Sequence, residues 1–453
     1  MTTTRETTNV TRLIDERPVG SLQITVFVLC AAINLLDGMD TQSIGVAAPM
    51  MAQGLGIKNA EFGPIFSAAL LGAALGAIGF GMLADRVGRK PLLVAALLII
   101  GAFTLLTAMA PTADILMVYR FLAGVGLGGA TPCFIALTSE YAPAKSRAAW
   151  TTLMWAGFPF GAMLGAFLNS AVIAEYGWRA IFYVGGVLPL VLAVFMAALL
   201  PESLKFLVGQ PQGQGAARKV LARMGVTGLS EGTRLTADEE AIKPSPRHLF
   251  TEGRAVGTLL LWVPFFLGFG ILSVAVLWTP SLLRMNDIPP AATAFVVAFN
   301  GLGGCIGQAT AGWIIGKFGL IRTLVPAFIL GALATAGLGY GASSVGLAAT
   351  FIGLNGLLVG FGSAGAIALA ALIYPTAIRS TGVGLGMAMG RFGQMIAPLI
   401  AGAMLGAGWN ASQIMTVIGA GAIIAAIFIV MFKSWSDGHA HGLQATTREA
   451  AVP

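Results

Sequence analysis

Charged residues are scarce in this chain of 453 residues. Asp, Glu, Lys and Arg together make up 10% of it, whereas hydrophobic residues make up 57%. A soluble globular protein carries about 25% charged residues, which cover its surface. The shortage of charge therefore excludes a soluble fold of this length.

Cysteine and histidine are also rare, with three of each. The cysteines lie far apart inside apolar runs, which excludes a disulfide framework or a cysteine metal site. The histidines lie outside those runs, so a proton relay within a membrane would have to use carboxylates. We find no nucleophile, metal-binding or cofactor motif, and expect no enzyme activity, no cofactor and no metal. The glycine-rich stretch 124–129 has no preceding strand, so helix packing explains it better than nucleotide binding.

Long apolar runs are abundant. Many contain about 20 residues or more, the length that crosses a hydrocarbon layer roughly 30 Å thick. Hydropathy predicts twelve spans, near 22–49, 60–83, 91–110, 113–138, 148–172, 179–200, 255–283, 291–315, 321–341, 345–372, 380–405 and 411–432. We predict an all-α polytopic membrane protein with twelve transmembrane helices, surrounded by the lipid bilayer.

The positive charges predict the orientation. With the N-terminus inside, 21 of the 26 lysines and arginines lie on the cytoplasmic side and three outside. This bias predicts that both termini are cytoplasmic. It also accounts for the net charge of +7 without a nucleic-acid partner. The polar N-terminus has no short apolar core with a cleavage site, so we expect a tail and not a signal peptide.

The spans fall into two sets of six. We expect five regions: tail 1–20, six-helix bundle 21–200, central cytoplasmic loop 201–254, six-helix bundle 255–433 and tail 434–453. A weak repeat relates 81–88 to 312–319, 231 positions later. A duplicated chain of this kind predicts two pseudo-symmetric bundles with a site between them near mid-membrane.

Two carboxylates lie inside the first predicted span. Asp37 and Asp40 are three residues apart, hence on one face of a helix. Neighbouring carboxylates in a poorly solvated site resist ionising together, so one is expected to take up a proton readily. We predict that they couple transport to protons, without assigning which one titrates. The alternative is that Asp40 only balances Arg391 or Arg120.

Two arginines also lie inside spans. A charge at the bilayer centre costs about 2.5–3.5 kcal/mol on insertion scales, so it normally faces a partner or a watery cavity. A guanidinium grips a carboxylate at two points, so Arg391 is a candidate for binding an anionic substrate; the alternative is a static ion pair. Arg120 is predicted to modulate the nearby acids, and Glu140 lies near a cytoplasmic end.

The charged turn 81–90 is a candidate cytoplasmic gate. Acids and bases there can pair and separate in each cycle, with partners on neighbouring loops. The predicted gate residues are Asp85, Arg86, Gly88, Arg89 and Arg379. The alternative for Arg89 and Lys90 is that they only anchor the topology. The predicted substrate contacts are Arg391, Asp40, Gln394, Trp155 and Phe269, although each aromatic alone is more often lipid-facing or core.

The plan of six spans, a loop and six spans, with the turn at 81–90, resembles the major facilitator superfamily. The segment 37–41, with Ala48-Pro49, resembles the first-helix signature of its aromatic acid:proton symporter family. The segments 138–141 and 374–391 support the same resemblance. One departure is Gly316 before Lys317, where the family often has an acid, which leaves the matching gate of the second half open.

The resemblance implies a proton-coupled symporter that imports a small aromatic carboxylate, such as a benzoate or hydroxybenzoate, across the bacterial inner membrane by alternating access. It marks Asp37 and Asp40 for coupling, and Arg120, Glu140, Arg379 and Arg391 as important for transport. We expect a monomer. The alternatives are a transporter of another organic acid or a sugar, a drug exporter, or a sensor, which the loop of about 54 residues at 201–254 makes less favoured. The ring substituents accepted and the proton stoichiometry stay open.

Overall fold

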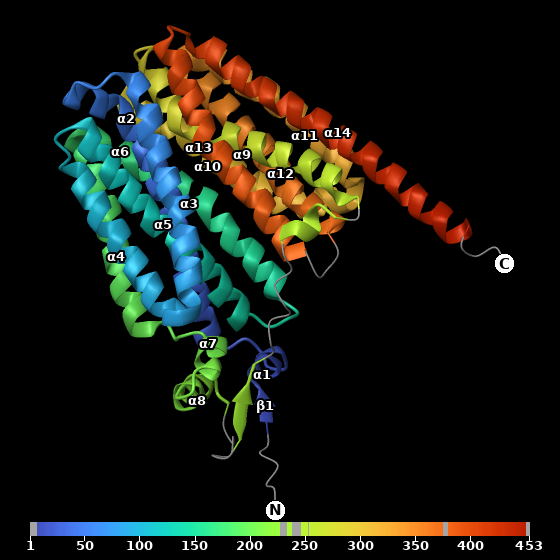
Figure 1. Ribbon diagram of the computed structural model, residues 1–453. Coiled ribbons are helices and arrows are strands. Elements are labelled where there is room, and N and C mark those ends of the chain that lie inside the picture. The colour runs from blue at the N-terminus through green and yellow to red at the C-terminus, as the bar shows by residue number, and fades with distance from the viewer. Residues whose placement is uncertain (1–6, 227–232, 238–245, 252, 375–378, 450–453) are drawn as a thin grey trace, which may run out of the picture. The chain divides into compact units, whose positions relative to one another are not determined.

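The computed structural model describes residues 7–226, 233–237, 246–251, 253–374 and 379–449 (Figure 1). Within these ranges the side chains at 148, 151–152, 371–373, 379–380 and 437–449 are not described. The chain is dominated by helices.

Eleven described helices are long and apolar enough to cross a membrane. They are α2 (Ser21–Leu55), α3 (Phe62–Val87), α4 (Arg89–Ala108), α5 (Ala113–Tyr141), α6 (Arg147–Leu199), α9 (Arg254–Arg284), α10 (Pro290–Phe318), α11 (Leu320–Tyr340), α12 (Val345–Ile373), α13 (Arg379–Gly406) and α14 (Ala411–Glu449). Helices suit this apolar chain because they satisfy every backbone hydrogen bond within one segment.

Helix α6 contains two of the predicted spans. Its 53 residues are interrupted at Gly177, where φ is 73° and ψ is 180°. Only glycine adopts such a conformation without a steric penalty, so the chain turns there between the spans predicted at 148–172 and 179–200. The prediction of twelve membrane-crossing helices is confirmed.

Shorter elements occupy the predicted N-terminal tail and central loop. They are β1 (Thr7–Asn9), α1 (Val10–Asp15), α7 (Leu204–Gly209), α8 (Gln214–Arg223), β2 (Arg234–Thr236) and the 3₁₀ turn η2 (Pro246–Leu249). Two further 3₁₀ turns, η1 (Asn59–Glu61) and η3 (Gly341–Ser343), connect long helices. Strands β1 and β2 pair in parallel, with Thr8 opposite Leu235. The tail is therefore attached to the loop.

The chain forms two compact units. Unit 1 comprises Met1–Ser43, Ala68–Gly165 and Glu175–Glu240, and unit 2 comprises Ile44–Ser67, Ala166–Ala174 and Ala241–Pro453. Unit 1 has a buried apolar core that runs from α2, α4 and α5 into α1, α7 and α8. Unit 2 has cores among α9, α11, α12 and α14.

Glycines allow helices to touch in both units. A Cβ at Gly72 or Gly76 of α3 would collide with the backbone of α5, and one at Gly303 or Gly307 of α10 would collide with the backbone of α12. Small residues at four-residue spacing permit this close packing. The two pairs are 231 positions apart, the offset of the sequence repeat.

The turns that follow α3 and α10 repeat as well. Gly88 has φ 98° and ψ 166°, and Gly319 has φ 87° and ψ 149°, again 231 positions apart. Both conformations favour glycine because a Cβ would be strained there. The weak sequence repeat thus corresponds to a structural one.

Within unit 2, the segments of α2, α3 and α6 that are predicted to lie near the extracellular side pack against later helices. Gly45 lies against Val276 and Leu277 of α9. The Ser67 hydroxyl donates to the Met395 carbonyl of α13 at 2.7 Å. Ser170 donates likewise to Ala291 of α10 at 2.8 Å. These segments of α2, α3 and α6 therefore pack against α9, α13 and α10 within unit 2.

Candidate functional site

Asp40 of α2 forms a two-point ion pair with Arg120 of α5 inside unit 1. Arg120 Nη1 lies 3.0 Å from Asp40 Oδ1, and Arg120 Nη2 lies 2.5 Å from Asp40 Oδ2. The side chain of Asp40 is only 5% exposed and that of Arg120 only 2%. The Thr104 hydroxyl of α4 donates to Asp40 Oδ1 at 3.3 Å. Three helices thus hold one buried carboxylate.

This geometry matches the alternative in which Asp40 balances Arg120. A buried charge without a partner is strongly destabilising, so each member of the pair stabilises the other. The pair does not exclude a role in transport, because an ion pair that opens and closes is a way to bind and release a proton. The coupling role of Asp40 stays a prediction.

Asp37 lies one turn before Asp40 on α2 and is also buried, with 8% of its surface exposed. Next to it, a Cβ at Gly38 would collide with the α6 backbone at Phe158 and Ala162. Close contact with α6 therefore fixes the depth and rotation of α2, and with it both carboxylates.

Arg391 lies on α13 in unit 2 and is half-buried. Its Nη1 donates to Gln394 Oε1 at 3.4 Å. Within the described part of unit 2, no carboxylate forms a salt bridge with Arg391. The static ion pair considered above is therefore not found among the described residues of that unit.

Aromatic rings lie beside this arginine's helix. Phe265 and Phe269 of α9 are stacked, with ring centroids 6.3 Å apart and planes 4° apart. A Cβ at Gly390 would meet the Phe269 ring. The predicted contacts Arg391, Gln394 and Phe269 therefore belong to one pair of packed helices, α9 and α13. Trp155 lies on α6 in unit 1, where it is half-buried.

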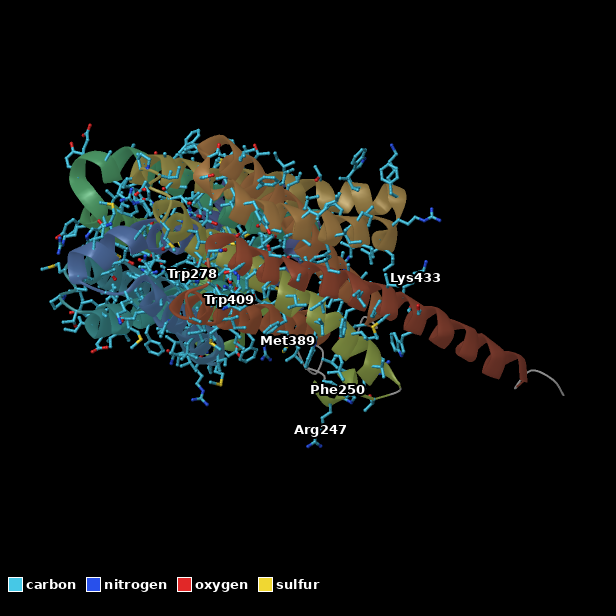
Figure 2. The ribbon with its side chains drawn as sticks, turned by 90° about the horizontal axis from the view of Figure 1, so that it is seen from above. Arg247, Phe250, Trp278, Met389, Trp409 and Lys433 are labelled. Carbon is cyan, nitrogen blue, oxygen red and sulfur yellow. The ribbon has the colours of Figure 1, made fainter. Side chains whose placement is uncertain are left out.

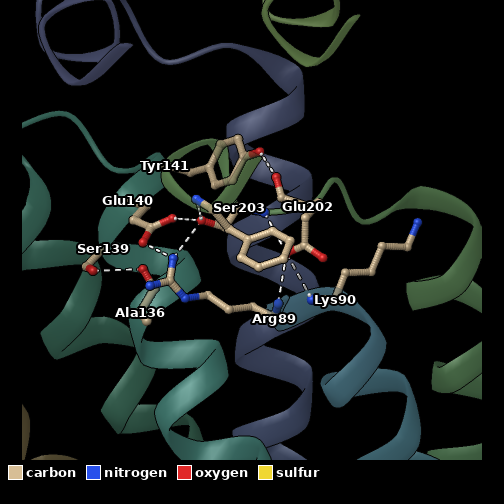
Figure 3. A network of polar contacts seen from close by, with 9 residues as sticks. Arg89, Lys90, Ala136, Ser139, Glu140, Tyr141, Glu202 and Ser203 are labelled. Carbon is tan, nitrogen blue, oxygen red and sulfur yellow. Dashed lines mark hydrogen bonds and ion pairs between the residues drawn. The ribbon is translucent and has the colours of Figure 1, made fainter. Parts of the chain in front are cut away.

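A polar network lies at the start of α4 in unit 1 (Figure 3). Arg89 Nη1 forms an ion pair with Glu140 of α5 and donates to Ser203 Oγ at 2.6 Å. Ser203 Oγ in turn donates to Glu140 Oε2 at 2.5 Å. Lys90 points its ammonium away from Glu140 in this view. Arg89 and Glu140 thus pair within unit 1, and the gating role of Arg89 stays a prediction.

Glu202 caps the N-terminus of α4. Its Oε1 accepts from the backbone N–H of Arg89 at 2.9 Å and of Lys90 at 3.2 Å. Tyr141 Oη donates to the Glu202 carbonyl at 2.7 Å. The first N–H groups of a helix lack partners within it and carry partial positive charge, so a carboxylate there is favourable. A residue 113 positions away from Arg89 therefore completes this turn.

The remaining predicted gate residues differ. Gly88 is buried, and a Cβ there would collide with Glu202. Asp85 and Arg86 are exposed, and within the described part of unit 1 neither forms a salt bridge. The side chain of Arg379 lies outside the described residues. Their gating roles stay predictions.

Glu202, Ser203 and the Tyr141 hydroxyl are members of this network that were not predicted from the sequence. A signal for Ser203 exists, because a serine just before a short apolar segment is typical of a helix cap. Ser203 does cap α7 by accepting from the Phe206 N–H at 3.1 Å. The position of Glu202 against α4 has no local sequence signal.

Comparisons with known proteins agree with this architecture. The family model of the Major Facilitator Superfamily matches residues 30–352 and 285–453. Among solved structures, a D-xylose-proton symporter superposes with a TM-score of 0.71 at 17% identity, covering 91% of this chain and 98% of that one. The nucleoside transporter NupG gives a TM-score of 0.68 at 12% identity, with coverage of 91% and 99%. At such low identity these two structures establish the fold alone.

Curated relatives are more similar in sequence. The 4-hydroxybenzoate transporter PcaK of Pseudomonas putida is 34% identical, over 93% of this chain and 95% of that protein. The gallate transporter of the same species is 35% identical over 96% and 95%. The 3-(3-hydroxy-phenyl)propionate transporter of Escherichia coli K12 is 36% identical over 89% and 93%. The chain therefore belongs to the major facilitator superfamily and, within it, to the family of these aromatic acid transporters.

Proposed function

We propose that this protein is a secondary active transporter that takes up a small aromatic carboxylate, such as a hydroxybenzoate, together with protons. The observation that carries the proposal is Arg391, a guanidinium within a span that has no acid in salt-bridge contact in the described part of its own unit. A cation inside a membrane needs a partner, and a substrate carboxylate is one. The names of the relatives support a benzoate-type acid.

Each predicted residue has a role in the proposed cycle. Asp37 and Asp40 bind and release the proton, and Arg120 holds Asp40 when it is charged. Arg391 and Gln394 bind the substrate carboxylate, while aromatic side chains such as Phe269 and Trp155 contact its ring. Alternating access exposes these groups to one side of the membrane and then to the other.

The proposed location is the bacterial inner membrane, with both termini cytoplasmic. The partners are the substrate, protons and the surrounding lipids, and we propose that the monomer suffices. Moving one elementary charge through 100 mV is worth about 2.3 kcal/mol. A monoanion that travels with one proton carries no net charge, so a membrane potential contributes only when more protons travel.

The test is uptake of radiolabelled 4-hydroxybenzoate into proteoliposomes with an imposed pH gradient, acid outside. We expect saturable accumulation that a protonophore abolishes. Unlabelled benzoates should compete, whereas dicarboxylates and xylose should not. Competition by xylose alone would favour the sugar-transporter alternative, and binding without accumulation would favour a sensor.

A further inference from the structure

An apolar crevice lies among α9, α13 and α14 of unit 2. Its volume is about 580 Å³, and α9, α13 and α14 line it with apolar side chains only. Val256 and Leu259 of α9 and Ile424 of α14 line it and remain half-exposed, so the crevice opens to the surface. Its volume lies within the range of small-molecule sites, about 300–1,000 Å³.

The lining of this crevice suits a hydrocarbon environment. Its lining residues belong to three membrane-spanning helices, and the lining offers almost no polar surface that could hold water. A crevice in such a surface is filled by acyl chains, whose flexible methylenes adapt to the irregular wall.

Positive charges gather at one end of the crevice. Arg254 is the first residue of α9, two positions before the lining residue Val256. Helix α14 packs against this end of α9, because a Cβ at Gly257 of α9 would touch the Trp435 ring of α14. Helix α9 also directs its positive N-terminal end here.

A second cation lies near the same end. Phe250 packs edge-on against the crevice residue Trp262, with ring centroids 5.7 Å apart and planes at 87°. This contact fixes η2, whose Arg247 is exposed. Figure 2 shows the Arg247 side chain extending outward beyond Phe250.

We propose that the crevice binds an anionic diacyl phospholipid, with its acyl chains against α9, α13 and α14 and its phosphate near Arg247 and Arg254. Basic pockets between transmembrane helices bind anionic headgroups, and each nearby cation contributes about 1 kcal/mol. Aromatic residues such as Trp262 and Trp435 are typical of the depth where headgroups begin.

The test is a native mass spectrometry titration of the purified full chain. It compares 1-palmitoyl-2-oleoyl phosphatidylglycerol with the phosphatidylcholine of the same chains. We expect the first phosphatidylglycerol to bind more tightly than the first phosphatidylcholine. Arg254→Gln and Arg247→Gln should each reduce this preference about fivefold.

The crevice itself is tested by filling it. Ile424→Trp should weaken the first binding event for both lipids, whereas Ile78→Trp on the exposed face of α3 should not. Arg322→Gln removes an exposed cation of α11 and is the matched charge control. The proposal is overturned if the preference is absent or is unchanged in the Arg254 and Arg247 variants, or if Arg322→Gln lowers it equally.

Discussion

At the residue scale, the buried ion pair of Asp40 and Arg120 stabilises the fold, and Asp40 is also a residue that we predict to couple transport to protons. The pair is buried and bidentate, so neither charge can lose its partner without cost. Removing one member of a buried pair costs about 3–5 kcal/mol, since the other charge stays buried without compensation. Effects on folding and on proton coupling therefore have to be separated by experiment.

The first prediction concerns Asp40→Asn. We expect proton-driven accumulation of 4-hydroxybenzoate to fall to background. The asparagine amide, unlike a carboxylate, does not bind and release a proton near neutral pH. Thr104→Val is the control: it removes a single hydrogen bond, worth about 0.5–1.5 kcal/mol, and should leave accumulation intact. The double variant Asp40→Asn/Arg120→Gln should recover thermal stability without recovering uptake. Accumulation at the parental level by Asp40→Asn would contradict the coupling role.

The second prediction concerns Arg391→Lys. An ammonium keeps the charge but cannot grip a carboxylate at two points. Hydrogen bonds to charged groups are worth about 1.5–3 kcal/mol, so we expect KM for 4-hydroxybenzoate to rise about tenfold or more. Arg322→Lys at an exposed position of α11 serves as the control and should leave KM unchanged. An unaltered KM in Arg391→Lys would remove this residue from the proposed binding site.

At the scale of the element, helix contacts at glycines and caps decide which movements are possible. Gly45 permits α2 to approach α9 within unit 2, and Glu202 holds the first turn of α4 within unit 1. Both features are contacts between segments distant in the sequence.

The third prediction is that Gly45→Leu slows uptake severely. A Cβ at this position would lie 2.8 Å from the Val276 carbonyl oxygen, so the leucine keeps α2 from closing on α9. Gly79→Leu on α3 is the control, because a Cβ there meets nothing within 4 Å. Initial rates in proteoliposomes measure both variants. Equal rates would show that this contact is not part of the transport cycle.

The fourth prediction concerns Glu202→Gln. The amide oxygen still accepts from the N–H groups of Arg89 and Lys90, but the charge that favours the helix N-terminus is lost. Such a charge is worth about 0.3–1 kcal/mol, up to about 2 when partly buried. We expect a lower Tm of the purified protein. Glu16→Gln is the control, because Glu16 pairs with Arg12 at an exposed position and contributes little. A Tm shift in Glu16→Gln as large as that in Glu202→Gln would contradict this account.

At the scale of the whole molecule, the distribution of charge predicts the orientation. The fifth prediction is that a cysteine at Lys58 reacts with a membrane-impermeant maleimide in intact cells, whereas a cysteine at Lys219 reacts only after lysis. Both positions are exposed. Cys30 and Cys133 are buried, and Cys305→Ser removes the partly exposed native thiol. Labelling of Lys219→Cys in intact cells would reverse the predicted topology.

The long elements were predictable because membrane insertion depends on local composition. Each predicted span of about 20 apolar residues corresponds to a helix or to one half of α6. The turn at Gly177 separates the two halves of α6. The repeat was predictable at two turns, one at Gly88 and one at Gly319, because the backbone conformation at both positions favours glycine. The ordered tail was not, because β1 has only three residues and depends on β2, more than 220 positions away.

By itself the sequence determined the class of protein, the number of spans and the few ionisable residues inside them. These follow from the cost of placing polar groups in hydrocarbon, which acts on each residue separately. Only the tertiary structure decided that Asp40 pairs with Arg120, that Arg89 pairs with Glu140 and that Glu202 caps α4. Such pairings depend on how far each helix is rotated and shifted against its neighbours. Side-chain packing between distant segments sets that rotation, and the hydropathy of the sequence does not predict it.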